Sequence, residues 1–165
     1  MRTVKAEPLT AEAFRPFGDV IEVNDAARHF PINYGQTERY HDLAAIDCGA
    51  DGGRVGVSLF RSTPVDGPIT IRVMEYHPLS SQAFMPLGAY PYLVVVAPKG
   101  AFDAAKMRVF KAMPGQGVNY HPGTWHHFSL ALEAVSDFLV IDRIGEGDNC
   151  VEHELTADEQ VTVSL

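Results

Sequence analysis

Short apolar stretches with alternating polar positions recur along the whole chain, and glycine and proline separate them. The 14 glycines and 11 prolines are scattered, which divides the chain into many short pieces. Pieces rich in Val, Ile, Phe and Tyr are predicted as strands, at residues 20–23, 55–61, 69–77, 92–97, 107–111, 118–121, 125–131 and 137–143. Only residues 10–14 are predicted as a helix, with Thr10 as its N-cap. The pattern therefore predicts an all-β fold, a jelly roll or closed barrel with minor short helices.

The strand at residues 69–77 ends in two groups that could carry chemistry. Alternate side chains of a strand share a face, so Ile69, Ile71 and Val73 are expected to point the same way as Glu75 and His77. If the aliphatic side chains face a barrel interior, a carboxylate and an imidazole follow them inward. Burial of both would require pairing, hydrogen bonds or a metal. The alternative is that the strand ends here and both groups lie in water at the rim.

A second segment, residues 115–127, holds three histidines, His121, His126 and His127. Pro122 and Gly123 mark a tight turn between two strands. His126 has the same strand parity as Leu130 and is predicted to point inward, whereas His127 should face the other way unless a bulge intervenes. One inward histidine is more often a core residue than a ligand, but three histidines together with Glu75 and His77 favour a site.

Two basic positions could bind a carboxylate. Arg39 lies in the polar and aromatic segment 33–42, where a guanidinium could clamp a carboxylate with two hydrogen bonds. The alternative for this segment is a solvated loop with an ordinary Arg–Glu surface pair. Asp142 and Arg143 end the strand at 137–143 and could lie at a barrel mouth, or form an exposed charge pair of little energetic value.

Composition and charge limit the class of protein. A length of 165 residues predicts one domain spanning residues 1–165. The formal net charge of −8 argues against nucleic acid and anionic membrane as partners, and it requires local positive charge, from Arg, Lys or a metal, to bind an anionic substrate. No apolar run could span a bilayer and the first residues lack a signal-peptide pattern, so a cytoplasmic protein is expected. Cys48 and Cys150 are expected as thiols.

These segments resemble the two motifs of the cupin family. The second motif is a glycine, five residues and then Pro-x-Gly-x-x-His, and Gly115, Gly123 and His126 match that spacing, with His121 in the proline place. Residues 75–88 stand in the place of the first motif, with glutamate where its first histidine would be and glutamine where its glutamate would be. The resemblance implies a cupin-type double-stranded β-helix and four metal-ligand positions, Glu75, His77, Gln82 and His126. Glutamine is a poorer ligand than glutamate, which leaves open whether a metal is bound.

More narrowly, the whole chain resembles the ureidoglycolate lyase family. The matching segments are residues 13–22, 38–44, 77–86, 117–121, 125–127 and 137–143. The resemblance implies a homodimer that acts on a small-molecule substrate in allantoin and purine breakdown, and that splits ureidoglycolate into glyoxylate and urea. It also implies a response to a divalent metal, nickel in particular.

The elimination reaction needs a base, an acid and a cation near the carboxylate of the substrate. The catalytic candidates are Glu75 or His77 as base or metal ligand, and His126 or His121 as acid. The candidates for substrate binding are Arg39, His41, Gln82 and Arg143. Competing functions are an amidohydrolase that releases ammonia from the same substrate, another cupin enzyme such as an epimerase or dioxygenase, and a non-catalytic module that binds a small acid.

Overall fold

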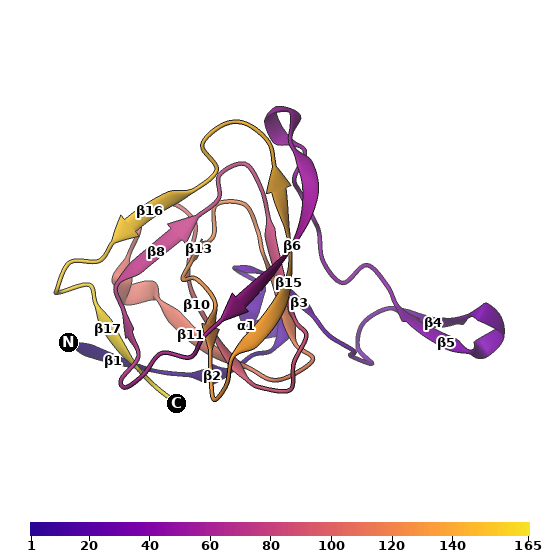
Figure 1. Ribbon diagram of the computed structural model, residues 1–165, viewed down its shortest axis with the longest axis horizontal. Coiled ribbons are helices and arrows are strands. Elements are labelled where there is room, and N and C mark those ends of the chain that lie inside the picture. Colours follow the sequence, from indigo (N-terminus) through magenta and orange to yellow (C-terminus); the bar gives the residue numbers. More distant parts are fainter.

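The computed structural model describes all of residues 1–165, and strands make up most of its regular structure (Figure 1). The strands of the first half are β1 (Arg2–Lys5), β2 (Glu7–Pro8), β3 (Gly18–Ile21), β4 (His29–Ile32), β5 (Thr37–Tyr40), β6 (Arg54–Ser62), β7 (Thr70–Ile71), β8 (Val73–Tyr76) and β9 (Gln82–Pro86). Those of the second half are β10 (Tyr92–Ala97), β11 (Arg108–Ala112), β12 (Gly117–Tyr120), β13 (Trp125–His126), β14 (Leu130–Ala131), β15 (Ser136–Ile144), β16 (Val151–Glu154) and β17 (Val161–Ser164). The helices are α1 (Ala11–Phe14) and three 3₁₀ turns, η1 (Asn33–Gly35), η2 (Ala50–Gly52) and η3 (Ala104–Lys106). No helix has both the length and the apolar character of a membrane span.

Two sheets form the body of the barrel. One has the order β16-β8-β13-β10-β11-β2, with β14 also on β10, and the other has the order β3-β12-β9-β15-β6. Both sheets contribute to one apolar cluster, which we call the inner core, from Val94 and Phe110 in the first sheet to Phe84, Val118 and Phe138 in the second. The all-β barrel with few short helices is therefore confirmed.

A second cluster, the outer core, lies on the other face of the larger sheet. Along β10, Val94 and Val96 belong to the inner core, whereas Leu93 and Val95 belong to the outer core. The small sheet β1-β17-β7 supplies part of this second cluster, including Val161. Strand β10 is buried on both faces because it separates the two cores, which explains its unbroken apolar sequence.

The short helix forms where the sequence predicts it. The Ala13 N–H donates to the side-chain oxygen of Thr10 at 3.2 Å, so Thr10 is the N-cap. Phe14, fully buried, packs edge-on against Phe110 at 5.7 Å between ring centroids and closes one end of the inner core. The role of this helix is to deliver that aromatic ring into the barrel.

The predicted strand at residues 69–77 is in fact two strands that belong to different sheets. The chain leaves β7, which pairs with β17, and enters β8, which pairs with β13 and β16, at the exposed residue Arg72. The break shifts the alternation, so Ile71 packs in the outer core together with Met74 while Glu75 points to the barrel side, toward His126. The prediction that Ile69 and Ile71 share a face with Glu75 is therefore wrong.

The predicted strand at residues 125–131 is also interrupted. Its two ends pair with β10, His126 opposite Val96 and Leu130 opposite Leu93, so residues 127–129 lie opposite only two residues of β10. One extra residue in one strand is a β-bulge, and it reverses the parity beyond it. Leu130 consequently lies in the outer core, so the prediction that it shares a face with His126 is wrong. The inward prediction for His126 is confirmed, because its side chain is buried against Tyr120 of the inner core.

A hairpin projects from the barrel, and we call residues 28–41 the arm. Strands β4 and β5 pair with each other and with no other strand, and the hairpin extends to one side of the barrel (Figure 1). At its base the His41 N–H donates to the Arg28 carbonyl at 2.8 Å. Segment 33–42, which the sequence leaves unassigned, therefore forms the tip and the returning strand of this arm.

Candidate active site

Four polar side chains from three strand ends meet inside the barrel. Glu75 on β8 lies opposite His126 on β13 in the register of the sheet, His77 follows β8, and Gln82 begins β9. The Gln82 Oε1 atom lies 3.1 Å from His77 Nε2 and 3.2 Å from His126 Nε2. The Glu75 Oε1 atom lies 3.5 Å from His126 Nε2 and 4.0 Å from His77 Nε2. The structure thus brings together the four residues that the cupin motifs align as metal ligands.

The residues around this cluster hold it rigidly. The His126 ring is 1% exposed and stacks on the Tyr120 ring, with 4.1 Å between centroids and 7° between planes. Gln82 Nε2 donates to Asp142 Oδ2 at 3.1 Å. Because a carboxylate only accepts hydrogen bonds, this contact fixes which end of the amide is the oxygen and directs Oε1 at the two imidazoles.

The hydrogen bonds of the two histidines fix which nitrogen of each ring donates to the backbone. His77 Nδ1 donates to the Asn149 carbonyl at 2.6 Å, and His126 Nδ1 donates to the Thr124 carbonyl at 3.0 Å. In a neutral imidazole the other nitrogen, Nε2, is then an acceptor. With both rings neutral, two Nε2 lone pairs, an amide oxygen and a carboxylate oxygen point at one place, an arrangement that a proton on one ring or a bound cation would stabilise.

Electrostatics indicate which cation suits the cluster. The contact with His126, opposed by burial, holds the pKa of Glu75 below its usual range, so the carboxylate is charged at neutral pH. Burial lowers the pKa of His126 despite the neighbouring carboxylate, so this ring favours its neutral form. A proton on His126 is therefore a poor solution, whereas a metal ion would satisfy all four acceptors at once.

The ligand set fits a divalent first-row transition metal. It offers two imidazole nitrogens, one carboxylate oxygen and one amide oxygen, and the ligand atoms of Glu75, His77 and His126 all lie within 4.8 Å of one another. Atoms bound to one such ion at about 2.1 Å lie roughly 3.0–3.4 Å apart, close to the separations in this cluster. The Nδ1 hydrogen bonds to backbone carbonyls are also those that metal-binding histidines commonly make.

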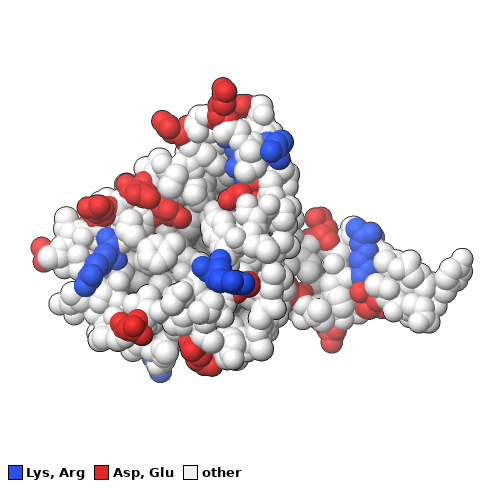
Figure 2. Space-filling model, in the orientation of Figure 1, with Lys and Arg blue, Asp and Glu red and all other residues white.

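An open cavity of about 320 Å³ leads to the cluster, and its charged lining is acidic. Glu75 and His126 lie at its base, and Glu152 and Glu154 of β16 lie at its rim. Acidic side chains also gather on the surface over β8 and β16 (Figure 2). No Lys or Arg lines this cavity. Within one copy of the chain, the cationic group that an anionic substrate requires is therefore not supplied by a basic side chain.

Cys150 contacts the Glu75 oxygen that does not face the histidines. Its thiol donates to Glu75 Oε2 at 3.6 Å, so the two oxygens of this carboxylate have different surroundings. Burial, together with the charge of Glu75, raises the pKa of Cys150 to about 11. The thiol thus stays protonated at neutral pH and serves as a hydrogen-bond donor.

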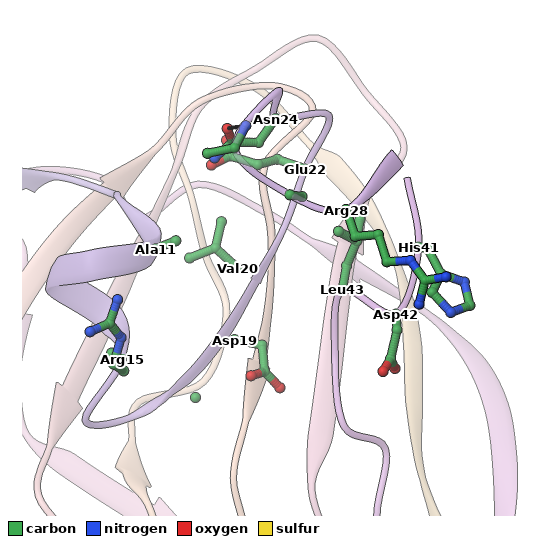
Figure 3. Close-up of a pocket in the computed structure, with 13 residues that line it drawn as sticks. Ala11, Arg15, Asp19, Val20, Glu22, Asn24, Arg28, His41, Asp42 and Leu43 are labelled. Atoms are coloured by element: carbon green, nitrogen blue, oxygen red, sulfur yellow. Dashed lines mark hydrogen bonds between the residues drawn. The ribbon is translucent and has the colours of Figure 1, made fainter. Parts of the chain in front are cut away.

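His121 and His41 lie at a different place, on the outside of the smaller sheet. His121 Nε2 lies 3.0 Å from Asp19 Oδ2, an atom that also accepts from Asn119 Nδ2 and the Ala45 N–H. Asp19 and His41 line a separate cavity of about 590 Å³ between the base of the arm and the body. Figure 3 shows this cavity, with Arg15 on the side of α1 and His41 on the side of the arm.

The two arginines predicted from the sequence occupy contrasting places. Arg39 is exposed on β5 of the arm. Arg143 is 8% exposed, and its guanidinium donates to the carbonyls of Ala50, Asp51 and Glu146. In this structure Arg143 thus holds two loops at the end of β15, and Arg39 is free to contact something outside its own chain.

Two further residues shape the cluster: Asp142, which the sequence places at a barrel mouth without a role toward Gln82, and Tyr120, which the sequence does not single out. Asp142 fixes the Gln82 amide, and Tyr120 supports the His126 ring. A signal for Asp142 was present, because it shares strand parity with Phe138 and Val140, both of which are in the inner core.

Comparisons with known proteins identify relatives over the full chain. The family model described as ureidoglycolate lyase matches residues 1–164. A ureidoglycolate lyase of Pseudomonas putida (strain W619) is 48% identical over 165 residues, which cover 99% of this chain and 98% of the relative. One from Burkholderia cepacia is 57% identical over 150 residues, covering 90% and 84%. Among solved structures, an oxalate decarboxylase formate complex of Lactobacillus farciminis matches with a TM-score of 0.38 and 12% identity, over 59% of this chain and 26% of that one. The resemblance in sequence is thus confirmed by the family match and the two relatives, and the chain belongs to the ureidoglycolate lyase family.

Proposed function

We propose that this protein is a ureidoglycolate lyase, which eliminates urea from ureidoglycolate and leaves glyoxylate. The observation that carries the proposal is the convergence of Glu75, His77, Gln82 and His126 in the barrel of a chain that belongs to this family. Such a cluster binds and polarises a small oxygen-rich substrate, and the cavity that leads to it is of a size for one.

The reaction moves one proton and breaks one bond. The central carbon of ureidoglycolate carries a hydroxyl, a carboxylate and a urea nitrogen. As the C–N bond breaks, the hydroxyl oxygen becomes the aldehyde oxygen of glyoxylate, and its proton goes to the urea nitrogen. No water is consumed, so the reaction is an elimination. The site must accept the first proton, protonate the leaving nitrogen and neutralise the carboxylate.

Glu75 is the best base in this arrangement. Its pKa is held below the usual range, mainly by the contact with His126, so it is charged at neutral pH. Oxygen Oε1 faces the two histidines, whereas Oε2 accepts from Cys150, and Glu75 lines the cavity. We propose that Oε2 accepts the proton of the substrate hydroxyl, and that the same carboxyl group then donates this proton to the departing urea nitrogen. His126, whose burial favours the neutral form, is a ligand in this scheme rather than a proton donor.

A divalent metal fits the four acceptors, and we infer that Glu75, His77, Gln82 and His126 hold it. The family resemblance points to nickel. When bound, such an ion supplies a Lewis acid that neutralises charge on the hydroxyl and carboxylate oxygens of the substrate. Asp142 and the backbone carbonyls of Asn149 and Thr124 keep the ligands oriented toward one point.

We further propose that residues 1–165 act as one domain, that the enzyme is a homodimer, and that it works in the cytoplasm. Both main sheets share the inner core, which supports a single domain. Cys48 is buried and Cys150 exposed, and they form no disulfide, which agrees with a reducing compartment. The exposed apolar strand and the arm, described below, support the dimer.

The test is product analysis with purified protein. Incubation with ureidoglycolate should release urea in equal amount to glyoxylate, after subtraction of the spontaneous decay of the substrate. A chelator should abolish the enzymatic part, and added nickel should restore it. Release of ammonia in place of urea would instead support the amidohydrolase, and no turnover with any metal would remove the enzymatic proposal.

A further inference from the structure

The arm lacks partners within its own chain. Its two strands pair only with each other, and Tyr34 at the tip is fully exposed. A two-stranded hairpin alone is marginally stable in water, so an arm of this kind is expected to pack on another surface. The ribbon extends roughly 15–20 Å from its base, which is enough to reach across a second molecule.

The body of the same chain offers an apolar surface without a partner. Strand β6 is the edge of the smaller sheet and pairs only with β15. Its outward side chains Val55, Val57 and Leu59 are 52%, 66% and 67% exposed. A nine-residue edge strand with such a row is prone to pair with another chain unless something covers it. We call these three residues the β6 row.

The arm leaves the body on the same face as the β6 row. In register, Val57 lies opposite Ile141 and Leu59 opposite Leu139, while the alternate residues of β15 point into the inner core. The chain that returns from the arm crosses this outward face too, because the Ala45 N–H donates to Asp19 there. An arm and an apolar row on one face form a self-complementary surface, for which a second copy related by a two-fold axis is the natural occupant.

Charge indicates what the arm brings to the second copy. The cavity at the metal cluster has Glu152 and Glu154 at its rim and no basic side chain, although the substrate is an anion. On the arm, Glu38 pairs with His29 at 2.7 Å. Arg39, the next residue, is exposed and makes no hydrogen bond or ion pair in its own chain. It lies on the opposite face of the ribbon from Glu38, and it shares that face with its register partner Phe30. The arm thus presents a basic side chain, and the lining of the cavity lacks one.

We propose that two copies of the chain exchange arms across the face that carries the β6 row, and that Arg39 of each copy completes the active site of the other by binding the substrate carboxylate. The inference rests on the proposed function for the identity of the substrate, but the exchange itself does not. Removal of Arg39 should lower kcat/KM by about 10- to 100-fold, because the substrate carboxylate would lose a guanidinium partner that binds it with two hydrogen bonds.

Subunit complementation tests the shared site. Glu75→Gln and Arg39→Ala proteins, each with a different affinity tag, are co-expressed, and the mixed dimer is isolated with both tags. If Arg39 acts in the other copy, one of the two sites contains both wild-type residues, so the mixed dimer recovers about half of the wild-type rate. If Arg39 acts in its own copy, both sites of the mixed dimer are defective and no rate is recovered, which overturns the proposal. His77→Ala replaces Glu75→Gln in a second pair, and Lys5→Ala, on the remote strand β1, should leave the rate unchanged.

Cross-linking tests the exchange without any activity. In a Cys150→Ser background, Arg39→Cys and Glu152→Cys proteins are mixed and treated with a short bis-maleimide. A covalent dimer that forms in the mixture, and not with either variant alone, supports the exchange, and its absence overturns it. Light scattering should give a dimer for the wild type and a folded monomer for Leu59→Asp. A monomeric wild type, or a Leu59→Asp protein that stays dimeric, also counts against the proposal. Cross-linking of the two cysteine variants, together with a wild-type protein that releases no urea, would contradict the proposed function and leave the arm exchange standing.

Discussion

The amide of Gln82 donates to the carboxylate of Asp142, and this one contact turns its oxygen toward both His77 and His126. A glutamine that was free to rotate could present its NH₂ group instead, which would repel a cation. The contact therefore keeps the amide oxygen of Gln82 directed at the two imidazoles. The orientation of this candidate ligand thus depends on Asp142, which does not itself contact either histidine.

Replacing Asp142 with asparagine should weaken the metal site while the fold survives. Asparagine can accept from the glutamine amide or donate to its oxygen, so it no longer fixes the direction of Gln82. We expect a loss of about 10- to 100-fold in metal affinity, measured by titration calorimetry with nickel or zinc. Asp66→Asn, at an exposed position, is the matched control. Equal affinities in the two variants would show that the orientation of Gln82 is not what holds the metal.

Removing His77 should affect turnover far more than stability. The ring is partly exposed, and its loss deletes one acceptor of the cluster and one hydrogen bond to the Asn149 carbonyl. For His77→Ala we expect kcat to fall by about 10²- to 10⁴-fold. Chemical denaturation should place its stability within about 1 kcal/mol of the wild type. Turnover near the wild-type level would take His77 out of the mechanism.

Acid should reveal the contribution of Asp19 to stability. Burial raises the pKa of this group, but hydrogen bonds from Asn119, the Ala45 N–H and His121 outweigh it, so the folded-state pKa lies below the ordinary 3.8. A lowered carboxyl pKa stabilises the fold above the unfolded value, and this stability is lost as the pH falls through the folded value. Asp19→Asn should be less stable than the wild type at pH 6 by about 1 kcal/mol, since water partly screens the site. Urea denaturation at a series of pH values should show the difference beginning to shrink as the pH falls below 3.8 and vanishing only below the folded-state pKa. A difference that persists there would point to packing instead.

Two phenylalanines form a matched pair for the inner core. Phe14 is fully buried against Phe110, whereas Phe128 is 53% exposed. Phe14→Ala should cost about 3–5 kcal/mol, because it leaves a cavity that the barrel cannot close. That loss lowers the melting temperature by roughly 10 °C for a chain of this size. Phe128→Ala should shift melting far less, and similar shifts in both variants would refute the assignment of Phe14 to the core.

Sequence alone predicted most of the strands of the two main sheets, the capped helix and the residues of the cluster, because each follows from local pattern or motif spacing. It did not predict the arm strands β4 and β5, strand β9 that begins at Gln82, or the terminal strands β1, β2, β16 and β17. It failed where the chain changes partners. The switch between sheets at Arg72 and the extra residue after His126 each reverse which side chains share a face, and neither has a local signal. Motif spacing also could not tell that His121 pairs with Asp19 outside the barrel, since that depends on the direction in which the strand ends.

The pairing and burial of strand β10 determine where the molecule opens least. Its backbone is bonded to β11 along one edge and to β13 and β14 along the other, and cores cover both of its faces. Its amide protons can meet deuterium only when both layers separate together, so they should be the last to exchange. Because β13 carries His126 and pairs with this strand, the candidate active site is attached to the part of the protein that is expected to open least often.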